Sequence, residues 1–236
     1  MTEPTSSSGA DAFADAVRTV LVADDHPLVR TGLVGAVERA LTPEAILEVG
    51  DFPAAVEAIE AGSGIDLVVL DLGMPGAMGL SGLALLRGRW PELPVLIVTG
   101  VTDPRVVASA AAIGASGYVG KSAPAQEIEE ALRAVIAGEA PGLPAPDASR
   151  ETRAFAEKIG ALSPQQFKVM TLIGEGLLNK QIAHEMNLSV STVKGHVTEL
   201  LRKLDLPRRT MLIAALRELA EERGEETADY SAADRP

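Results

Sequence analysis

The chain has 236 residues, enough for one large or two small domains, of which 47% are hydrophobic and 23% charged. It contains no cysteine, which excludes disulfides and cysteine-ligated metals, and no apolar run long enough to span a membrane. The net charge is -12, yet residues 162–217 hold eight Lys and Arg against four Asp and Glu, a distribution typical of an acidic regulatory domain joined to a nucleic-acid binder.

The first 17 residues are small and polar and lack the features of a signal peptide, so we expect a disordered extension on a cytoplasmic protein. Strands and helices then alternate up to residue 138. The predicted strands are Val20–Ala23, Ile46–Val49, Leu67–Leu70, Val95–Val98 and Tyr118–Val119. The predicted helices are Leu28–Leu41, Pro53–Ala61, Leu80–Trp90, Pro104–Ile113 and Pro124–Ala137. Wholly apolar strands that alternate with helices predict an α/β doubly wound fold, with a five-stranded parallel sheet covered on both faces.

The rest of the chain has a different pattern. Residues 139–159 carry closely spaced Pro and Gly residues and are predicted to be a linker, with a short helix at Arg150–Lys158. Residues 160–222 are predicted to form an all-α domain of four helices, at Pro164–Gly174, Asn179–Met186, Ser191–Leu204 and Arg208–Glu222. Residues 223–236 are acidic and are predicted to be disordered.

Polar side chains follow the predicted strands at their carboxyl ends, where parallel sheets bind ligands. Asp24 and Asp25 follow the first strand and Asp71 the third, Thr99 ends the fourth, and Lys121 follows the fifth. Taken singly, Asp24 or Asp25 could be a helix N-cap. Adjacent carboxylates at a core edge need a positive partner, however, and oxygen ligands suit Mg²⁺. An aspartate beside Mg²⁺ can accept a phosphoryl group, with a lysine and a hydroxyl as further donors.

The second and third helices of the C-terminal block, joined by a tight turn, predict a helix-turn-helix. Its apolar residues lie on one side, and the start of its second helix is positioned for the major groove. The predicted DNA-binding residues are Lys180, Ser191, Thr192, Lys194, Gly195, Thr198 and Arg202. Gly195 costs about 1 kcal/mol against alanine inside a helix. Either the helix backbone approaches DNA closely there, or the glycine is merely tolerated.

Two sets of motifs resemble known domains. The segments VLVADDHPLVRTGL, DLVVLDLGMPGAMGL, PVLIVTG and GASGYVGKSAPAQEIEEALRAV closely resemble the receiver domain of two-component response regulators. The segment LSPQQFKVMTLIGEGLLNKQIAHEMNLSVSTVKGHVTELLRKLDLPRRT resembles the LuxR-type helix-turn-helix domain. In this order the two resemble the NarL/FixJ family of bacterial transcription regulators, over residues 19–138 and 160–220. Thr198, the adjacent acidic Glu199 and Gln165-Gln166 depart from that pattern and leave the base preference open.

The resemblance implies a flavodoxin-like receiver in which Asp71 accepts a phosphoryl group from a histidine kinase or a phosphotransfer protein. Mg²⁺ would be held by Asp25, Asp71 and the backbone carbonyl of Gly73, with Asp24 acting largely through water. His26 is expected to have a local role rather than to bind the metal. The residues that would contact the phosphoryl group or switch with it are Thr99, Tyr118 and Lys121.

The last predicted helix has an apolar stripe that packing on its own domain explains in part. The resemblance adds a dimerisation role for Met211, Leu212, Ala215 and Leu216. It also suggests that the unphosphorylated receiver covers the recognition helix, and that phosphorylation shifts the protein to a DNA-binding homodimer.

We therefore expect a regulator that binds double-stranded DNA, makes no membrane contact and is not an enzyme. A phosphatase that uses an aspartyl-phosphate would need an Asp-x-Asp motif after the first strand, and here the two aspartates are adjacent. A LuxR-type sensor of small molecules would not carry the aspartate set. The alternative that stays open is a receiver that acts through protein contacts without phosphorylation.

Overall fold

The computed structural model describes residues 17–62, 64–144 and 150–220, so the predictions for most of the N-terminal extension and for the acidic tail lie outside the described residues. The strands are β1 (Thr19–Ala23), β2 (Ala45–Val49), β3 (Leu67–Leu70), β4 (Val95–Thr99) and β5 (Gly117–Gly120). The helices between and after them are α2 (Pro27–Leu41), α3 (Phe52–Glu60), α4 (Leu80–Arg89), α5 (Pro104–Ile113) and α6 (Ala125–Ile136). In the described ranges, no helix combines the length and the apolar character that crossing a membrane requires.

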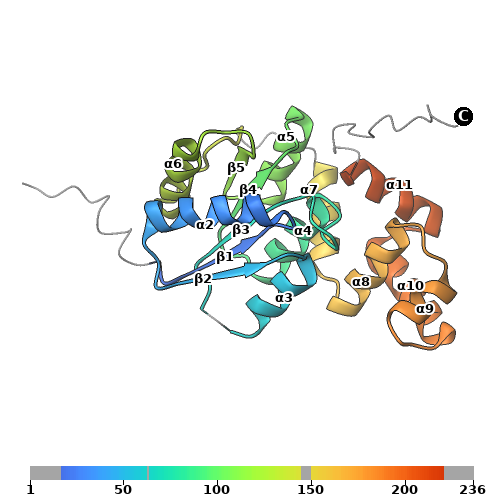
Figure 1. The fold of residues 1–236 in the computed structure, drawn as a ribbon. Helices are drawn as coiled ribbons and strands as arrows, with labels where there is room; N and C mark the ends of the chain where they lie inside the picture. Colours follow the sequence, from blue (N-terminus) through green and yellow to red (C-terminus); the bar gives the residue numbers. More distant parts are fainter. Residues whose placement is uncertain (1–16, 63, 145–149, 221–236) are drawn as a thin grey trace, which may run out of the picture.

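The five strands form one parallel sheet in the order β2-β1-β3-β4-β5, which confirms the predicted fold class. Side chains alternate between its faces. Val20 and Val22 of β1 join a core cluster with α2 and α6, while Leu21 and Ala23 join a second cluster with α3, α4 and α5. Figure 1 shows these two layers of helices on opposite faces of the sheet. Burial on both faces explains why the strands are uninterrupted apolar runs.

Local signals in the sequence explain where the helices begin and end. Pro27 occupies the first turn of α2, where a missing N–H costs nothing. Asp51 caps α3 by accepting a hydrogen bond of 2.8 Å from the backbone N–H of Ala54. Gly114 ends α5 with a φ of 100°, a left-handed conformation that glycine adopts easily. Such signals lie in the sequence itself, and the predicted bounds of these helices differ from the observed ones by no more than one residue.

The C-terminal part is wholly helical, with α7 (Arg150–Gly160), α8 (Pro164–Gly174), α9 (Asn179–Glu185), α10 (Val190–Leu204) and α11 (Arg209–Ala220). Helices α9 and α10 form the predicted helix-turn-helix, and Ile182, Val193 and Leu200 are buried in its core. A capping box begins α8, in which the Ser163 side chain accepts from the backbone N–H of Gln166 at 3.2 Å and the Gln166 side chain accepts from that of Ser163 at 3.1 Å.

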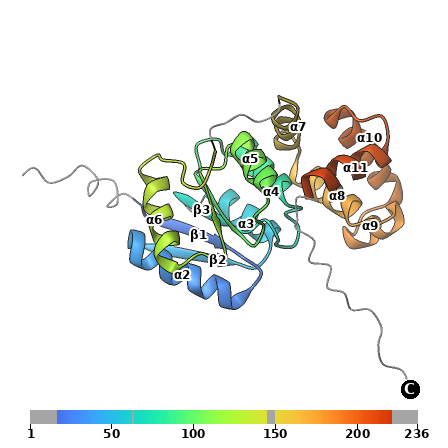
Figure 2. The same cartoon turned by 90° about the horizontal axis from the view of Figure 1, so that it is seen from above.

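The helical part packs directly on the sheet domain. Helix α7 lies against α4 and α5, and α11 also contacts α4 (Figures 1 and 2). The rings of Phe52 in α3 and Phe167 in α8 are 5.5 Å apart. One apolar cluster therefore runs through both parts. Helix α7, which falls inside the predicted linker, is consequently a packed element rather than a free spacer.

Candidate functional site

The three aspartates predicted to form a site lie together at the carboxyl ends of β1 and β3. The register pairs Ala23 with Leu70, and the backbone N–H of Asp71 donates to the carbonyl of Ala23 at 3.0 Å, so Asp71 follows β3 directly beside Asp24. Asp24 is 0% exposed and Asp71 3% exposed. One ligand atom from each of Asp24, Asp25, His26 and Asp71 lies within 4.8 Å of all the others. The sheet topology thus creates a dense, buried carboxylate cluster.

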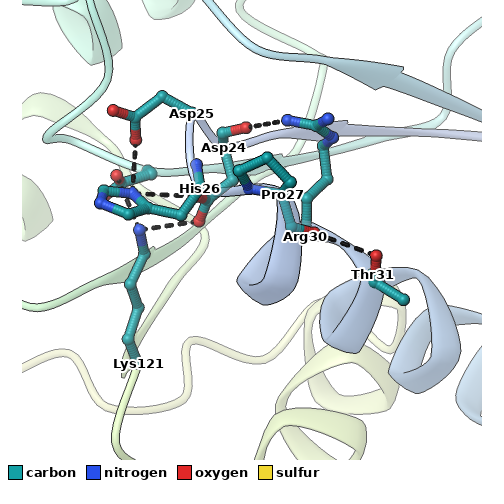
Figure 3. Close-up of polar contacts among 8 residues, drawn as sticks. Asp24, Asp25, His26, Pro27, Arg30, Thr31 and Lys121 are labelled. Atoms are coloured by element: carbon teal, nitrogen blue, oxygen red, sulfur yellow. Dashed lines mark hydrogen bonds and ion pairs between the residues drawn. The ribbon is translucent and has the colours of Figure 1, made fainter.

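Lys121 supplies a positive charge to this cluster. Its Nζ lies 2.8 Å from Asp24 Oδ2 (Figure 3). It also lies 2.8 Å from Asp71 Oδ2. The backbone N–H of Lys121 donates to the carbonyl of Thr99 at 2.8 Å, which aligns the ends of β4 and β5. Burial alone would lower the pKa of Lys121, but the hydrogen bonds and charges of Asp24 and Asp71 outweigh it and raise that pKa above its usual value. Lys121 therefore stays protonated and partly offsets the carboxylate charge.

The same residues fit a divalent cation. Asp24 Oδ2 and Asp25 Oδ1 are buried, with Lys121 Nζ 2.8 Å from the first and His26 Nδ1 2.7 Å from the second, and each oxygen atom keeps a lone pair free. Clustered oxygen atoms with spare lone pairs are the ligands that Mg²⁺ prefers. A methyl group built on Gly73 would lie 3.1 Å from Asp71 Oδ2, so the backbone of Gly73 is next to the carboxylate. The set Asp24, Asp25, Asp71 and Gly73 stays the predicted metal site.

Two further residues shape the cluster. His26 Nδ1 lies 2.7 Å from Asp25 Oδ1, and the backbone N–H of His26 donates to Asp24 Oδ1 at 2.8 Å (Figure 3). Arg30 donates to the backbone carbonyl of Asp24 at 2.7 Å and pairs with Glu48 of β2 at 3.3 Å. The sequence analysis did not single out Arg30. Arg30 could have been predicted from its position four residues after His26, because residues at this spacing lie on the same side of a helix.

The two predicted switch residues on β4 and β5 meet at one backbone position. Thr99 and Tyr118 are both buried. The Tyr118 hydroxyl donates to the carbonyl of Val101 at 2.9 Å, and Thr99 Oγ1 accepts from the N–H of Val101 at 3.5 Å. Both side chains are thus hydrogen-bonded to the segment that follows β4, and a movement of Thr99 would reach Tyr118 through this segment.

The predicted DNA-binding residues form an exposed face. Lys180, Ser191, Thr192, Lys194, Gly195, Thr198 and Arg202 are all exposed. The expectation that the receiver covers the recognition helix is therefore wrong for this arrangement. The sheet domain instead contacts α7 through α4 and α5, α11 through α4, and α8 through Phe52 and Phe167. No atom lies within 4 Å of a methyl group built on Gly195, so packing inside the chain does not require a glycine there.

The predicted dimer contacts are divided between core and surface. Leu212 is 0% exposed and Leu216 is 1% exposed, whereas Met211 is 47% exposed and Ala215 is half-buried. Leu212 and Leu216 are packed within their own chain. A dimer that used them would require α11 to leave α8 and α4, so the dimerisation role stays a prediction.

Comparisons with known proteins cover both parts of the chain. Residues 20–133 match the response regulator receiver domain family, and residues 160–216 match the LuxR family of bacterial regulatory proteins. The glycerol metabolism activator of Pseudomonas putida is 35% identical over 206 residues, covering 82% of this chain and 92% of that protein. The transcriptional activator DevR/DosR of Mycobacterium tuberculosis is 34% identical, covering 86% and 96%. The nitrate/nitrite response regulator NarL of Escherichia coli is 34% identical, covering 81% and 91%.

Solved structures were compared as well. The RcsB–DNA complex aligns with 85% of this chain and 98% of that chain, at 24% identity and a TM-score of 0.49.

Proposed function

Because the chain belongs to the NarL/FixJ family of response regulators, we propose that Asp71 is the phosphoacceptor of this DNA-binding response regulator and that its phosphorylation controls DNA binding. The observation that carries the proposal is the cluster at the carboxyl ends of the strands, where Asp71 lies beside two further carboxylates and 2.8 Å from Lys121 Nζ. The phosphoryl donor is a histidine kinase or a phosphotransfer protein.

The residues present suit transfer of a phosphoryl group to a carboxylate. A carboxylate oxygen of Asp71 attacks phosphorus, the bond from phosphorus to the donor nitrogen breaks, and an acyl phosphate forms on Asp71. Asp24, Asp25, Asp71 and the Gly73 carbonyl would hold Mg²⁺, which when bound would neutralise the charge on the oxygen atoms. Lys121 is already next to Asp71 Oδ2 and stays protonated, so it can pair with a phosphoryl oxygen without rearrangement of the backbone.

The output is a change in DNA binding by α10. Phosphorylation shifts a pre-existing equilibrium toward a DNA-binding homodimer. A shift from 1:99 to 99:1 requires about 5.5 kcal/mol of differential stabilisation. The names of the three relatives describe an activator of glycerol metabolism, a DNA-binding transcriptional activator and a nitrate/nitrite response regulator, which supports a regulatory rather than an enzymatic role.

The first test is the intact mass of the protein after incubation with Mg²⁺ and acetyl phosphate. We expect one added phosphoryl group in the wild type, none in Asp71→Asn, and slower addition in Asp25→Asn, which keeps the acceptor and weakens the metal site. DNA affinity is then measured in both states of the wild type. If no phosphoryl group is added, or if its addition leaves DNA affinity unchanged, the phosphorylation-independent alternative is favoured.

A further inference from the structure

The segment that follows Asp71 leads from the carboxylate to the DNA-binding domain. It begins at Gly73, whose backbone is adjacent to both Asp71 oxygens, since a methyl group built there would lie 3.1 Å and 3.6 Å from them. Met74 and Ala77 are each 0% exposed. A methyl group built on Gly76 would lie 2.7 Å from Pro53 Cδ at the start of α3. Met74 and Ala77 are therefore packed in the core while Gly73 and Pro75 are exposed, and a displacement of the segment shifts its buried residues against their neighbours.

The end of this segment has an unusual backbone. Met78 has a φ of 50°, a left-handed conformation that few residues other than glycine adopt. It lies between Gly76, with a φ of 82°, and Gly79, with a φ of 59° and the N-cap position of α4. Non-glycine residues held in this region often mark positions where the direction of a side chain matters to function. The question is therefore what the side chain of Met78 contacts.

Met78 contacts the DNA-binding domain at Gly174, the last residue of α8. A methyl group built on Gly174 would overlap Met78 Cε, would lie 2.6 Å from Met78 Sδ, and would lie 3.4 Å from Leu216 Cδ1 of α11. The thioether thus occupies the place where any side chain at position 174 would stand, beside α11. Only a glycine at this position accommodates the Met78 side chain in its observed place.

We propose that Met78 is a positioning residue that couples the state of Asp71 to the DNA-binding domain through its contact with Gly174. The inference rests on the proposed phosphorylation of Asp71. An added phosphoryl group changes the contacts of the adjoining backbone at Gly73, and the segment moves between two arrangements. Movement of Met78 changes its contact with α8, and by linkage a change at that contact alters ligand affinity at Asp71.

This route differs from the one through Thr99 and Tyr118. Those two residues are hydrogen-bonded to Val101 at the ends of β4 and β5, whereas Met78 precedes α4. It also differs from the Phe52–Phe167 contact, which joins the same two domains from α3 and not from the segment that follows Asp71.

The test measures the affinity of the full chain for beryllofluoride, a phosphoryl analogue, with Mg²⁺ by calorimetry. Gly174→Ala displaces Met78 from the other domain, and we expect it to change that affinity by about fivefold, the lower end of common coupling factors. Ala214→Ser is the matched control, because it also adds one atom to a helix of the same domain, at an exposed position of α11. It should leave the affinity for beryllofluoride unchanged.

A double-mutant cycle identifies Met78 as the carrier of the effect. In a Met78→Ala background the thioether is gone, so Gly174→Ala should have no further effect on the affinity for beryllofluoride. Met78→Ala alone should reduce the change in that affinity that DNA produces in the wild type. An unchanged affinity in Gly174→Ala, or an equal change in both backgrounds, overturns the role of Met78 and leaves the proposed function standing. A wild type that binds no beryllofluoride overturns both.

Discussion

The ion pair between Glu199 and Arg202 on the recognition helix predicts how salt affects DNA binding. Arg202 Nε lies 2.9 Å from Glu199 Oε2, and a second guanidinium nitrogen lies 2.5 Å from Oε1. The hydrogen bond from Arg202 lowers the pKa of Glu199, and the same bond raises the pKa of Arg202. Both groups are charged at neutral pH and neutralise each other. Arg202, predicted to bind DNA, is therefore held in an ion pair that competes with a phosphate for its charge.

Glu199→Gln removes the neutralising carboxylate, and its effect follows from counterion release. Each phosphate that a cation neutralises on duplex DNA adds about 0.9 to the slope of log affinity against log salt concentration. One additional contact therefore tightens binding by about fivefold in ~0.15 M salt, relative to its effect in ~1 M salt. A dimer on two half-sites doubles the change in slope.

The assay is fluorescence anisotropy with a duplex of random sequence at several salt concentrations, because this term does not depend on sequence. Glu185→Gln is the matched control, since it makes the same change in net charge at an exposed position of α9. We expect the slope to increase in Glu199→Gln and to change little in Glu185→Gln. Equal slopes in the two variants would refute the idea that Glu199 withholds Arg202 from DNA.

Three further predictions concern the cluster and the domain contact. Lys121→Met leaves Asp24 and Asp71 without their shared cation, so in EDTA the free energy of unfolding should fall by about 3 kcal/mol in urea titrations, and Mg²⁺ should restore part of it. Because the pKa of Lys121 is raised above 10.5, its contribution to the free energy of unfolding should be fully present below pH 10.5 and should be lost as pH rises through the raised pKa. Urea titrations over this pH range should show the loss in the wild type and not in Lys121→Met. A methyl group on Gly88 would overlap Gly160 Cα and lie 2.8 Å from its carbonyl carbon, so Gly88→Ala should cost about 1–3 kcal/mol and speed tryptic cleavage at the exposed Arg150.

The sheet and its carboxylates could be predicted because their signals are local. An uninterrupted apolar run such as Leu67–Leu70 indicates a strand buried on both faces, and Asp71 follows it at the end where ligands bind. Lys121 was predicted at the same edge, but its simultaneous contact with Asp24 and Asp71 depends on the register of β4 and β5. Register between strands far apart in sequence is set by the whole fold and not by the residues near Lys121.

The contact between the two domains could not be predicted for a related reason. Gly88 and Gly160 each look like an ordinary helix-terminal glycine, and nothing local indicates that their backbones touch. The apolar stripe of α11 is equally ambiguous, because a stripe that packs on its own chain and one that packs on a partner have the same spacing. The structure places Leu212 and Leu216 in the core of their own chain, which the spacing alone could not decide.

The exposure of α10 and the burial of α11 together change which step phosphorylation has to control under the proposed function. An exposed recognition face lets a monomer in this arrangement contact one half-site, so we expect the regulated step to be the joining of two monomers. Phosphorylation should then raise the cooperativity of binding on a duplex with two half-sites, through the effective concentration of the second subunit. The affinity for one half-site should change little. Titrations of phosphorylated and unphosphorylated protein against one-site and two-site duplexes measure this. An equal gain in affinity on both duplexes would mean that phosphorylation acts on the recognition helix itself.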